Sequence, residues 1–184
     1  INTIGPIIKK VLKKFNNKID LVIHIAGGGL GVKSIQPKYK DLVKVLNLNI
    51  LSLIEINKNL MPSMIKNKKG KIIHLSSIAA YEAVGSLAYN ISKSALNSYV
   101  KTMGRYLAKY NVVLSGIALG GFISKNNAMY RLKNKNKKDY LKFINQRLPR
   151  KKMGTVDEIL PLIDFLSSDK SGMMCGSVIL ADAA

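Results

Sequence analysis

The segment KIIHLS, residues 71–76, is nearly continuous in β-branched and aliphatic residues. A strand that is covered by helices on both faces has this composition, because neither of its sides meets water. Three further runs of the same kind occur along the chain: DLVIHIA (20–26), NVVLSGIA (111–118) and SVILAD (177–182). The sequence therefore predicts four buried strands.

Helical patterns separate these strands. Apolar residues recur at the spacing of an amphipathic helix near 6–15, 39–67, 86–110 and 157–168. Thr155 is a candidate N-cap for the last of these segments, and Glu158 follows at the position that completes a capping box. The alternation of strands and helices predicts an α/β fold with a Rossmann-like, doubly wound parallel sheet.

The composition is that of a globular protein. The chain has 184 residues, of which 47% are hydrophobic and 22% charged, which is enough for a single domain over residues 1–184. No apolar run reaches the roughly 18 residues of a membrane span, and the first residues lack the pattern of a secretory signal. The single cysteine, Cys175, has no partner for a disulfide or a C-x-x-C zinc motif. We expect a cytoplasmic protein without a metal site.

The formal net charge of +20 is spread along the chain, with lysine-rich segments at 66–71, 133–138 and 147–152. Three explanations stay open: a solvated basic surface, attraction of an anionic substrate or carrier, and nucleic-acid binding. The lysines accompany many Asn and Ile residues, which indicates a compositional bias and favours the solvated surface. Aromatic residues are not interleaved with the basic segments as base stacking would require, so nucleic acid is the least favoured partner.

The segment AYNISKSA, residues 88–95, places Tyr89 and Lys93 one helical turn apart. Taken alone, this spacing is most often an amphipathic ring beside a solvated cation. Here the helix follows the strand that ends in Ser76 and Ser77, and an open parallel sheet binds its ligand outside the carboxyl ends of its strands. Glycine-rich segments follow two other strands, at 26–31 and 119–124. We therefore expect a serine hydroxyl, a phenol and an ammonium to converge on one crevice.

This combination has a definite acid–base chemistry. A phenol has an ordinary pKa near 10 and is a poor base at neutral pH. An ammonium about 4 Å away, at an effective dielectric constant near 20, stabilises a phenolate by about 4 kcal/mol before desolvation. A downward pKa shift of about two to three units is therefore reachable. We expect Lys93 to lower the pKa of Tyr89, so that the phenol exchanges a proton with an oxygen that the serine orients.

Four segments, in order along the chain, resemble the short-chain dehydrogenase/reductase family, in the branch of the β-ketoacyl-acyl carrier protein reductases. The family patterns are D-x-L-V-N-N-A-G, G-x-I-V-N-I-S-S, Y-x-x-S-K and a closing segment that ends in V-D-G-G. The matching segments are DLVIHIAGG (20–28), GKIIHLSS (70–77), YNISKSAL (89–96) and 147–184. The resemblance implies an NAD(P)-dependent oxidoreductase that transfers a hydride between a nicotinamide cofactor and a carbonyl or secondary alcohol.

Carried over residue by residue, the resemblance implies four catalytic side chains. Tyr89 is the acid/base and Lys93 its pKa partner. Ser77, the second serine of the pair, orients the carbonyl; the loop to Tyr89 is one residue shorter than is usual in the family, which leaves Ser76 as an alternative. Asn49 lies where the family has a helix asparagine that completes a proton relay near the lysine.

The same resemblance implies residues that bind NAD or NADP. They are Ala26 and Gly27 on the adenosine side, Ile117 and Ser124 near the nicotinamide, and Tyr89 with Lys93 at its ribose. Leu119 replaces the proline of the family's P-G turn, which predicts a looser turn. The family's T-G-x-x-x-G-x-G loop, whose amides cradle the pyrophosphate, is absent, and roughly 60 residues are expected before Ile1. The sequence therefore predicts a partial Rossmann-like domain and does not choose between the two cofactors.

Two histidines and the tail depart from the family pattern. His24 and His74 replace asparagines, and their equivalent positions in neighbouring strands predict a packed, hydrogen-bonded pair, with a pH-sensitive contact as the alternative. The final residues, 182–184, replace D-G-G, which bears on the subunit contact of the expected homodimer or homotetramer.

The substrate is expected to be a small carbonyl or alcohol compound. The segment 122–150, which we call the lid, is basic and suits an anionic or carrier-bound substrate. A 3-oxoacyl thioester, a sugar derivative and another small ketone all stay open. A catalytically weak family member that acts as a binding or scaffold protein is the alternative to an enzyme.

Overall fold

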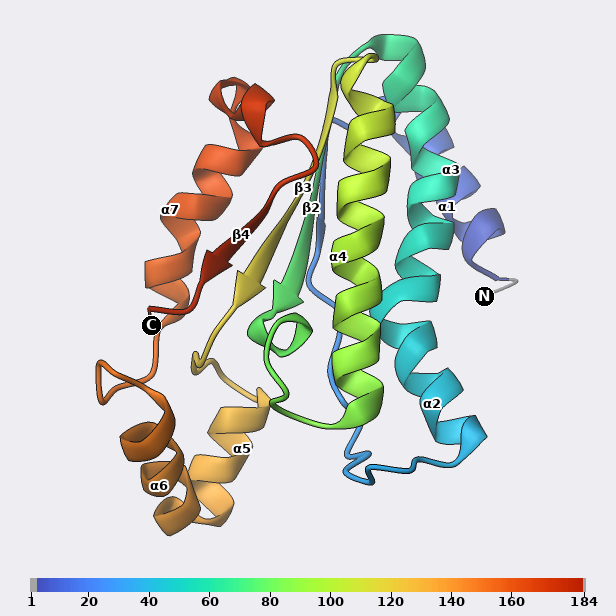
Figure 1. Ribbon diagram of the computed structural model, residues 1–184. Helices are drawn as coiled ribbons and strands as arrows, with labels where there is room; N and C mark the ends of the chain where they lie inside the picture. The colour runs from blue at the N-terminus through green and yellow to red at the C-terminus, as the bar shows by residue number, and fades with distance from the viewer. Residues whose placement is uncertain (1–2, 184) are drawn as a thin grey trace.

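Four parallel strands form the sheet of this protein (Figure 1). The computed structural model describes residues 3–183, and within them the strands are β1 (Leu21–His24), β2 (Gly70–Ser77), β3 (Val112–Leu119) and β4 (Val178–Ala181). They lie in the order β1-β2-β3-β4, and each neighbouring pair is parallel. The predicted parallel sheet is therefore confirmed.

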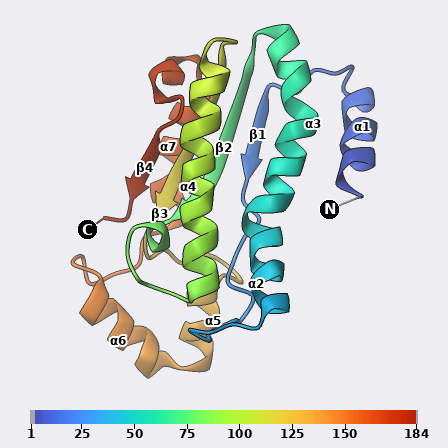
Figure 2. The ribbon, with the colours of Figure 1, turned by 45° about the vertical axis from the view of Figure 1, so that its right-hand side comes forward.

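Helices cover both faces of this sheet. In Figures 1 and 2, α3 and α4 lie on one face and α7 lies on the other. The α-helices of the described residues are α1 (Ile4–Lys14), α2 (Tyr39–Leu46), α3 (Ser52–Asn67), α4 (Leu87–Ala108), α5 (Ala128–Lys135), α6 (Lys137–Arg147) and α7 (Val156–Ser167). A short 3₁₀ turn, η2 (Ile78–Ala80), connects β2 to α4, and a second, η3 (Asp169–Met174), precedes β4. The expected α/β layering is confirmed.

The helical pattern predicted over 39–67 is not one continuous α-helix. A π-helical turn, η1 (Asn47–Leu51), separates α2 from α3. Such a turn holds one residue more than an α-helical turn, and it changes the direction in which the following side chains point. Asn49 lies at the centre of η1 and is fully buried. The irregularity therefore falls at one of the predicted site residues.

The core has two parts because successive strand residues point to opposite faces. On the side of α3 and α4, Ile72 packs in a cluster with Met64, Val100 and Leu107. On the side of α7, Ile73 packs in a second cluster, with Ile117, Leu119 and Leu166. Each fully buried aliphatic side chain contributes about 1.5–3 kcal/mol relative to an exposed one. Together the two clusters fix the sheet between its helical layers.

Two glycines let α4 approach the sheet closely. A Cβ atom on Gly104 would lie 2.3 Å from the backbone nitrogen of Gly176, so neither the helix nor the loop before β4 leaves room for a side chain there. The helix buries Leu96, Val100 and Leu107 against the core. This contact sets the depth of α4, and with it the level of the side chains at its N-terminal end.

The capping box predicted for α7 is present. The hydroxyl of Thr155 accepts a hydrogen bond from the backbone N–H of Glu158, and the Glu158 carboxylate accepts one from the N–H of Thr155. Among residues 3–183, no helix combines the length and the apolar character that crossing a bilayer requires.

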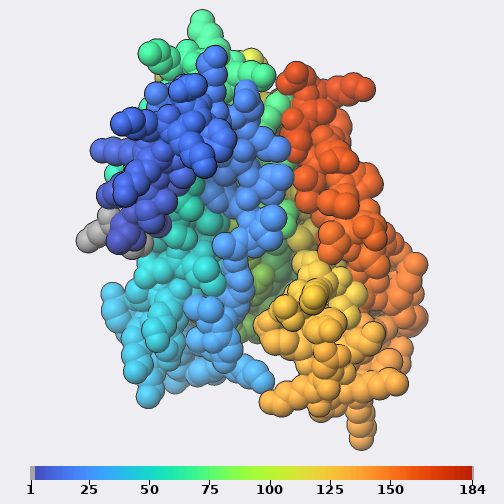
Figure 3. All heavy atoms as spheres, turned by 180° about the vertical axis from the view of Figure 1, so that it is seen from behind, coloured from blue at the N-terminus to red at the C-terminus, as the bar shows by residue number. Residues whose placement is uncertain are grey.

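The carboxyl ends of the strands lie at the lower edge of Figure 1, where α5 and α6 extend beyond the sheet. Seen from behind, a recess separates the loop that follows β1 from α5 (Figure 3). The green surface of the β2–α4 region is visible at the back of this recess. The recess lies at the edge where parallel sheets bind their ligands.

Candidate active site

Tyr89 and Lys93 lie in the first two turns of α4, one turn apart on the side that faces the sheet. Lys93 is only 3% exposed, and its ammonium donates a hydrogen bond of 2.8 Å to the backbone carbonyl of Leu75 in β2. The Lys93 nitrogen lies 5.7 Å from the centroid of the Tyr89 ring. The structure therefore brings the predicted pair together and fastens the lysine to the neighbouring strand.

The two serines at the end of β2 have different surroundings. The Ser77 side chain lies close enough to Tyr89 to lower the pKa of the phenol, and its hydroxyl accepts from the backbone N–H of Ala79 at 3.2 Å. Ser76 is buried, and its hydroxyl donates to the side-chain oxygen of Asn97 at 2.5 Å. Of the two serines left open by the sequence, Ser77 is the one beside the phenol.

Asn49 holds the loop after β1 against this pair. Its side-chain oxygen accepts from the backbone N–H of Gly28 at 2.9 Å, and its amide donates to the Gly28 carbonyl, also at 2.9 Å. The amide also donates to the Val45 carbonyl at 2.8 Å, one turn back. A Cβ atom on Gly27 would lie 2.9 Å from the Asn49 oxygen and 3.3 Å from the Lys93 nitrogen. Asn49 and Lys93 thus leave no room for a side chain at Gly27.

Burial dominates the protonation of the pair. Burial raises the pKa of the Tyr89 phenol, and the Ser77 side chain acts in the opposite direction. Burial lowers the pKa of Lys93 from 10.5 to about 8. The net downward shift expected for the pKa of Tyr89 is therefore wrong for this arrangement. The physical reason is that desolvation penalises both charged forms, while the ammonium is directed at the Leu75 carbonyl.

The residues predicted to line the cofactor are only partly accessible. Ala26 and Gly27 are exposed at the start of the loop after β1, whereas Ser124 is half-buried after β3. Gly28 has a φ of +134°, and a Cβ atom there would meet nothing within 4 Å. This open backbone fits the close approach of a dinucleotide. Ile117 is fully buried in the core facing α7, so the structure does not bring its side chain to the recess.

The turn that contains Leu119 is closely packed. Leu119 ends β3 and is buried, and the N–H of Gly120 donates to the Ala181 carbonyl at 3.0 Å. A Cβ atom on Gly120 would lie 2.5 Å from the Cα of Asp182. The looser turn predicted from the missing proline is not observed, because the tail packs directly against the glycine.

The lid packs together with the residues that directly follow it. Tyr140, Ile144 and Met153 are buried together, and a single bridge pairs Phe122 with Gly154. α5 and α6 therefore form a packed unit beyond the carboxyl ends of the strands rather than an extended loop.

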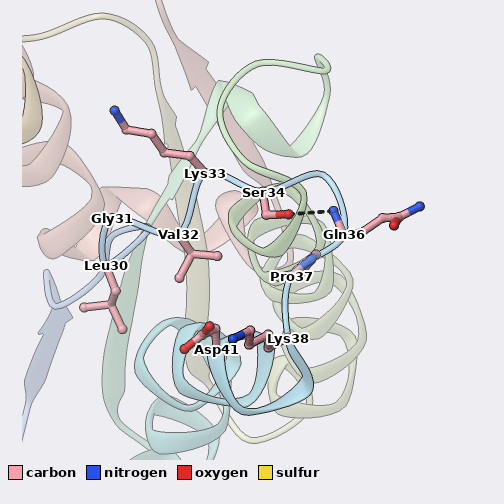
Figure 4. A pocket seen from close by; sticks show the side chains of 9 residues that line it. All are labelled: Leu30, Gly31, Val32, Lys33, Ser34, Gln36, Pro37, Lys38 and Asp41. Atoms are coloured by element: carbon pink, nitrogen blue, oxygen red, sulfur yellow. Dashed lines mark hydrogen bonds between the residues drawn. The ribbon is translucent and has the colours of Figure 1, made fainter.

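A pocket of about 440 Å³ lies beside the loop that follows β1 (Figure 4). Leu30 and Val32 point into it, toward Asp41 at the start of α2, whereas Lys33 points outward. Its lining includes neither Tyr89 nor the other predicted catalytic residues. The pocket is therefore a feature of the loop and not of the catalytic group.

The predicted histidine pair is confirmed in position. His24 and His74 are register partners of β1 and β2, and their rings stack with centroids 4.5 Å apart. They are joined through Asn57 of α3 and not to each other. Sequence reasoning missed Asn57, since an asparagine within a helical pattern indicates an exposed position. It also missed the Leu75 carbonyl, because a backbone acceptor has no sequence signal.

Comparisons with known proteins agree on one family. The family model described as enoyl-(acyl carrier protein) reductase matches residues 2–183. The 3-oxoacyl-[acyl-carrier-protein] reductase FabG of Buchnera aphidicola subsp. Baizongia pistaciae is 31% identical over 179 residues, which cover 97% of this chain and 70% of that protein. The chain thus corresponds to about 70% of the length of this relative.

Solved structures share the fold. A 3-oxoacyl (acyl-carrier-protein) reductase of Agrobacterium tumefaciens with NADP bound has a TM-score of 0.86 at 20% identity, covering 98% of this chain and 69% of that one. A 7α-hydroxysteroid dehydrogenase in complex with NADH and 7-oxoglycochenodeoxycholic acid has a TM-score of 0.85 at 24% identity, covering 98% and 69%. At these identities the likeness establishes the fold.

Proposed function

This chain belongs to the short-chain dehydrogenase/reductase family of NAD(P)-dependent oxidoreductases, and from that membership we propose that it interconverts a carbonyl compound and a secondary alcohol with Tyr89 as the acid/base. One observation carries the proposal. The Ser77 side chain lies beside the Tyr89 phenol, and the buried Lys93 nitrogen lies 5.7 Å from the centroid of the same ring. A hydroxyl that orients an oxygen, and a phenol that exchanges a proton with it, are the groups that this reaction needs.

The proposed roles follow from the surroundings of each group. Ser77 holds the substrate oxygen within reach of the Tyr89 hydroxyl. Because burial raises the pKa of Tyr89, the phenol keeps its proton at neutral pH and is ready to donate it to a carbonyl oxygen. Lys93 supplies positive charge beside the phenolate that remains, and Asn49 fixes the loop that covers the lysine.

A nicotinamide cofactor, when bound, supplies or accepts the hydride. Ala26, Gly27 and the open backbone at Gly28 would hold its adenosine side, while Lys93 and Tyr89 would contact its ribose. Ser124 would contact the carboxamide. Ile117 would contribute packing beneath the end of β3 and no direct side-chain contact. NADP and NADH are bound by solved structures of the same fold, and both stay open for this chain.

The substrate is proposed to be a 3-oxoacyl thioester or a sugar-type ketone. The name of the Buchnera relative supports the first class. The lid supports an anionic substrate or carrier, because basic side chains outnumber the single acidic one in it. The basic residues are Lys125, Arg131, Lys133, Lys135, Lys137, Lys138, Lys142, Arg147 and Arg150, and the acidic one is Asp139.

Substitution of the phenol tests the proposal. We expect Tyr89→Phe to lower kcat/KM for reduction by about 10²–10⁴-fold, the usual contribution of a general acid. The assay follows NADH or NADPH oxidation with an acetoacetyl thioester, a ketose and a small ketone. Unchanged turnover in Tyr89→Phe would contradict the proposal.

The serine pair provides a matched control. Ser77→Ala should lower kcat/KM, since it removes the hydroxyl beside the phenol. Ser76→Ala breaks a hydrogen bond with Asn97 and should affect stability more than turnover of the folded protein. The reverse ranking would assign the orienting role to Ser76.

A catalytically weak binding protein is the second candidate, and the raised pKa of Tyr89 favours it. A phenol whose pKa is raised by burial is a poor base for alcohol oxidation. Dinucleotide binding without turnover of any carbonyl or alcohol compound in the panel would support this candidate.

A further inference from the structure

A buried polar cluster lies next to the proposed catalytic group and has no role in the proposed reaction. Its members are His24 of β1, Asn57 of α3, His74 of β2 and Tyr99 of α4. His74 and Asn57 are fully buried, and His24 is 6% exposed. The imidazole rings stack within 9° of parallel, and the Tyr99 ring meets His74 edge-on at 5.8 Å. Two strands of the sheet and two helices that cover it thus meet in this cluster.

Asn57 is the centre of the hydrogen bonding. Its side-chain oxygen lies 2.7 Å from Nε2 of His24, and its amide nitrogen lies 3.0 Å from Nε2 of His74. The amide also donates to the Tyr99 hydroxyl at 3.1 Å. The oxygen of a side-chain amide only accepts hydrogen bonds, and its nitrogen only donates them. In this orientation, His24 therefore carries a proton on Nε2, and His74 presents an unprotonated Nε2.

The assigned protons imply a neutral His74 and are compatible with a neutral His24. His74 then carries its proton on Nδ1, and this atom is buried without a hydrogen-bond partner in the described part of the chain. A proton added to Nε2 of His74 would point at the amide N–H of Asn57, so that two hydrogen-bond donors would face each other. Protonating both rings would place two cations 4.5 Å apart in a stack. The geometry accepts the neutral pair and disfavours every state with a charged His74.

The charged surroundings act in the same direction. Burial lowers the pKa of His24, partly opposed by its bond with Asn57. Burial, followed by the charges of His24 and Lys93, lowers the pKa of His74 well below its usual range. The titratable groups against the pair are Tyr99 and Lys93, both from α4; α3 contributes the uncharged Asn57, and β3 contributes Gly116 opposite His74.

The cluster is linked to the lysine through β2. His74 directly precedes Leu75, whose carbonyl accepts a hydrogen bond from the Lys93 ammonium. Ser76 follows and is tied to Asn97 of α4. Three successive residues of one strand thus carry the histidine, the anchor of the lysine and a second contact with the same helix. A displacement of His74 would move the acceptor of Lys93 with it.

We propose that His24, Asn57, His74 and Tyr99 form a proton-sensitive clamp that positions Lys93: the neutral pair fixes β1, β2, α3 and α4 together, and protonation of the pair releases the clamp. The part that concerns Lys93 as a catalytic group rests on the proposed function. The protonation of the clamp and its effect on folding do not.

The direction of the pH effect follows from linkage. An unfolded histidine titrates near 6.5, whereas the clamped pair stays neutral to lower pH. Below 6.5 the unfolded chain therefore binds more protons than the folded one, and stability is lost as the pH falls. Above that value the contribution is complete and constant.

Side-chain nitrogen NMR of the unsubstituted protein tests the clamp directly. We expect His24 as the Nε2–H tautomer and His74 as the Nδ1–H tautomer at pH 7, with the pKa of each ring below its ordinary value. An amide flip would reverse both tautomers and keep the neutral pair. Either ring titrating near its ordinary value of about 6.5 would overturn the proposal.

Urea unfolding between pH 5 and 8 supplies the second measurement. The unfolding constant should rise by up to about tenfold per pH unit, for each titrating histidine, as the pH falls below 6.5. The double variant His24→Asn/His74→Asn should lose this dependence. Tyr99→Phe is the matched control, because it removes one acceptor of Asn57 but keeps both imidazoles, and it should keep the pH dependence. Equal slopes in the wild type and the double variant would overturn the clamp.

A lysine readout tests the link to Lys93. The NMR signal of the Lys93 side chain, assigned with Lys93→Met, should shift through the same acidic pH range as the histidine signals. The shift should be absent from the double histidine variant. Titrating histidines with an unmoved lysine signal would overturn the positioning role. Failure of the proposed function would appear instead as absent turnover with all of these signals intact.

Discussion

The two faces of β2 differ in what they bury. Toward α7, Ile73 and Leu75 pack in an apolar cluster around Leu166. Toward α4, Ile72 belongs to an equally apolar cluster, but His74 and Ser76 follow at the next two positions on that face. Each of these polar residues has a partner on a helix, Asn57 or Asn97. Over residues 72–76, the strand thus carries an apolar face toward α7 and, toward α4, a face whose carboxyl half is polar; Ser77, at the end of the strand, belongs to the proposed site.

The difference shows how polar groups are placed in a core. A buried polar atom without a partner costs about 1–3 kcal/mol, so each histidine and serine of the α4 face requires a matching side chain from a helix. Up to Leu75, the α7 face has no such requirement and depends on volume alone. We therefore expect substitutions on the α7 side to change stability without changing chemistry, and substitutions on the α4 side to change both.

The largest expected effect on stability is on the α7 face. Leu166 is fully buried, and Leu166→Ala should lower the free energy of unfolding by about 2–5 kcal/mol through lost burial and a cavity. Urea unfolding measures this loss. Leu160→Ala on the same helix is the control, because Leu160 is 43% exposed and its loss should cost well under half as much. Turnover per folded molecule should stay the same. A lower turnover in Leu166→Ala would contradict the expectation that substitutions on the α7 side change stability alone.

The buried lysine of the α4 face should have a smaller effect, of opposite sign. The lowered pKa of Lys93, from 10.5 to about 8, means that keeping it charged below pH 8 costs up to about 3 kcal/mol. Its contribution to stability is complete above 10.5 and is lost as the pH falls toward 8. Lys93→Met should therefore raise the free energy of unfolding at pH 7, and the gain should shrink as the pH rises through this window.

The exposed Lys101 on the same helix gives the control for this measurement. Lys101→Met should change stability little at any pH. A gain in Lys93→Met that is equal at pH 7 and at pH 10 would show that packing, and not charge, is responsible. Turnover should be lost in Lys93→Met whatever its stability, which would sharpen the contrast with Leu166→Ala.

The smallest effect is expected at the start of α7. Thr155→Ala removes one half of the capping box and should cost about 1 kcal/mol. Thr155→Ser keeps the accepting hydroxyl and should restore most of the loss. Thermal unfolding of the three proteins compares them, and identical stabilities would show that the cap contributes nothing to this face.

The strands could be predicted because burial on both faces leaves a continuous apolar run in the sequence. Their ends were less certain: the pattern of β1 continues to Ala26, but the strand stops at His24, where the loop bends toward Asn49. The start of α7 could be predicted because its capping box is a local signal. The π-helical turn was not predicted, since its five residues have no composition that distinguishes them from a regular helix.

The candidate site was predictable as a set of residues but not as an electrostatic arrangement. Spacing alone put Tyr89 near Lys93, and the structure agrees. Spacing does not reveal how much water each group loses, so the direction of the Tyr89 pKa shift was wrong. The choice between Ser76 and Ser77 depended on partners, Asn97 and Tyr89, that only the packed structure identifies. Ile117 matched the family pattern, but its burial has no signal in one sequence.

Because of the π-helical turn, the number of residues between α2 and α3 matters as much as their identity. Each residue of a helix advances about 100° around its axis, so deleting one residue from Asn47–Leu51 would restore a regular helix and rotate everything before it relative to α3. Asn49 and α2 would then face different neighbours, although every remaining side chain was unchanged. Exchanges of residue type at Asn47 or Leu51 should be tolerated far better than a deletion of either one.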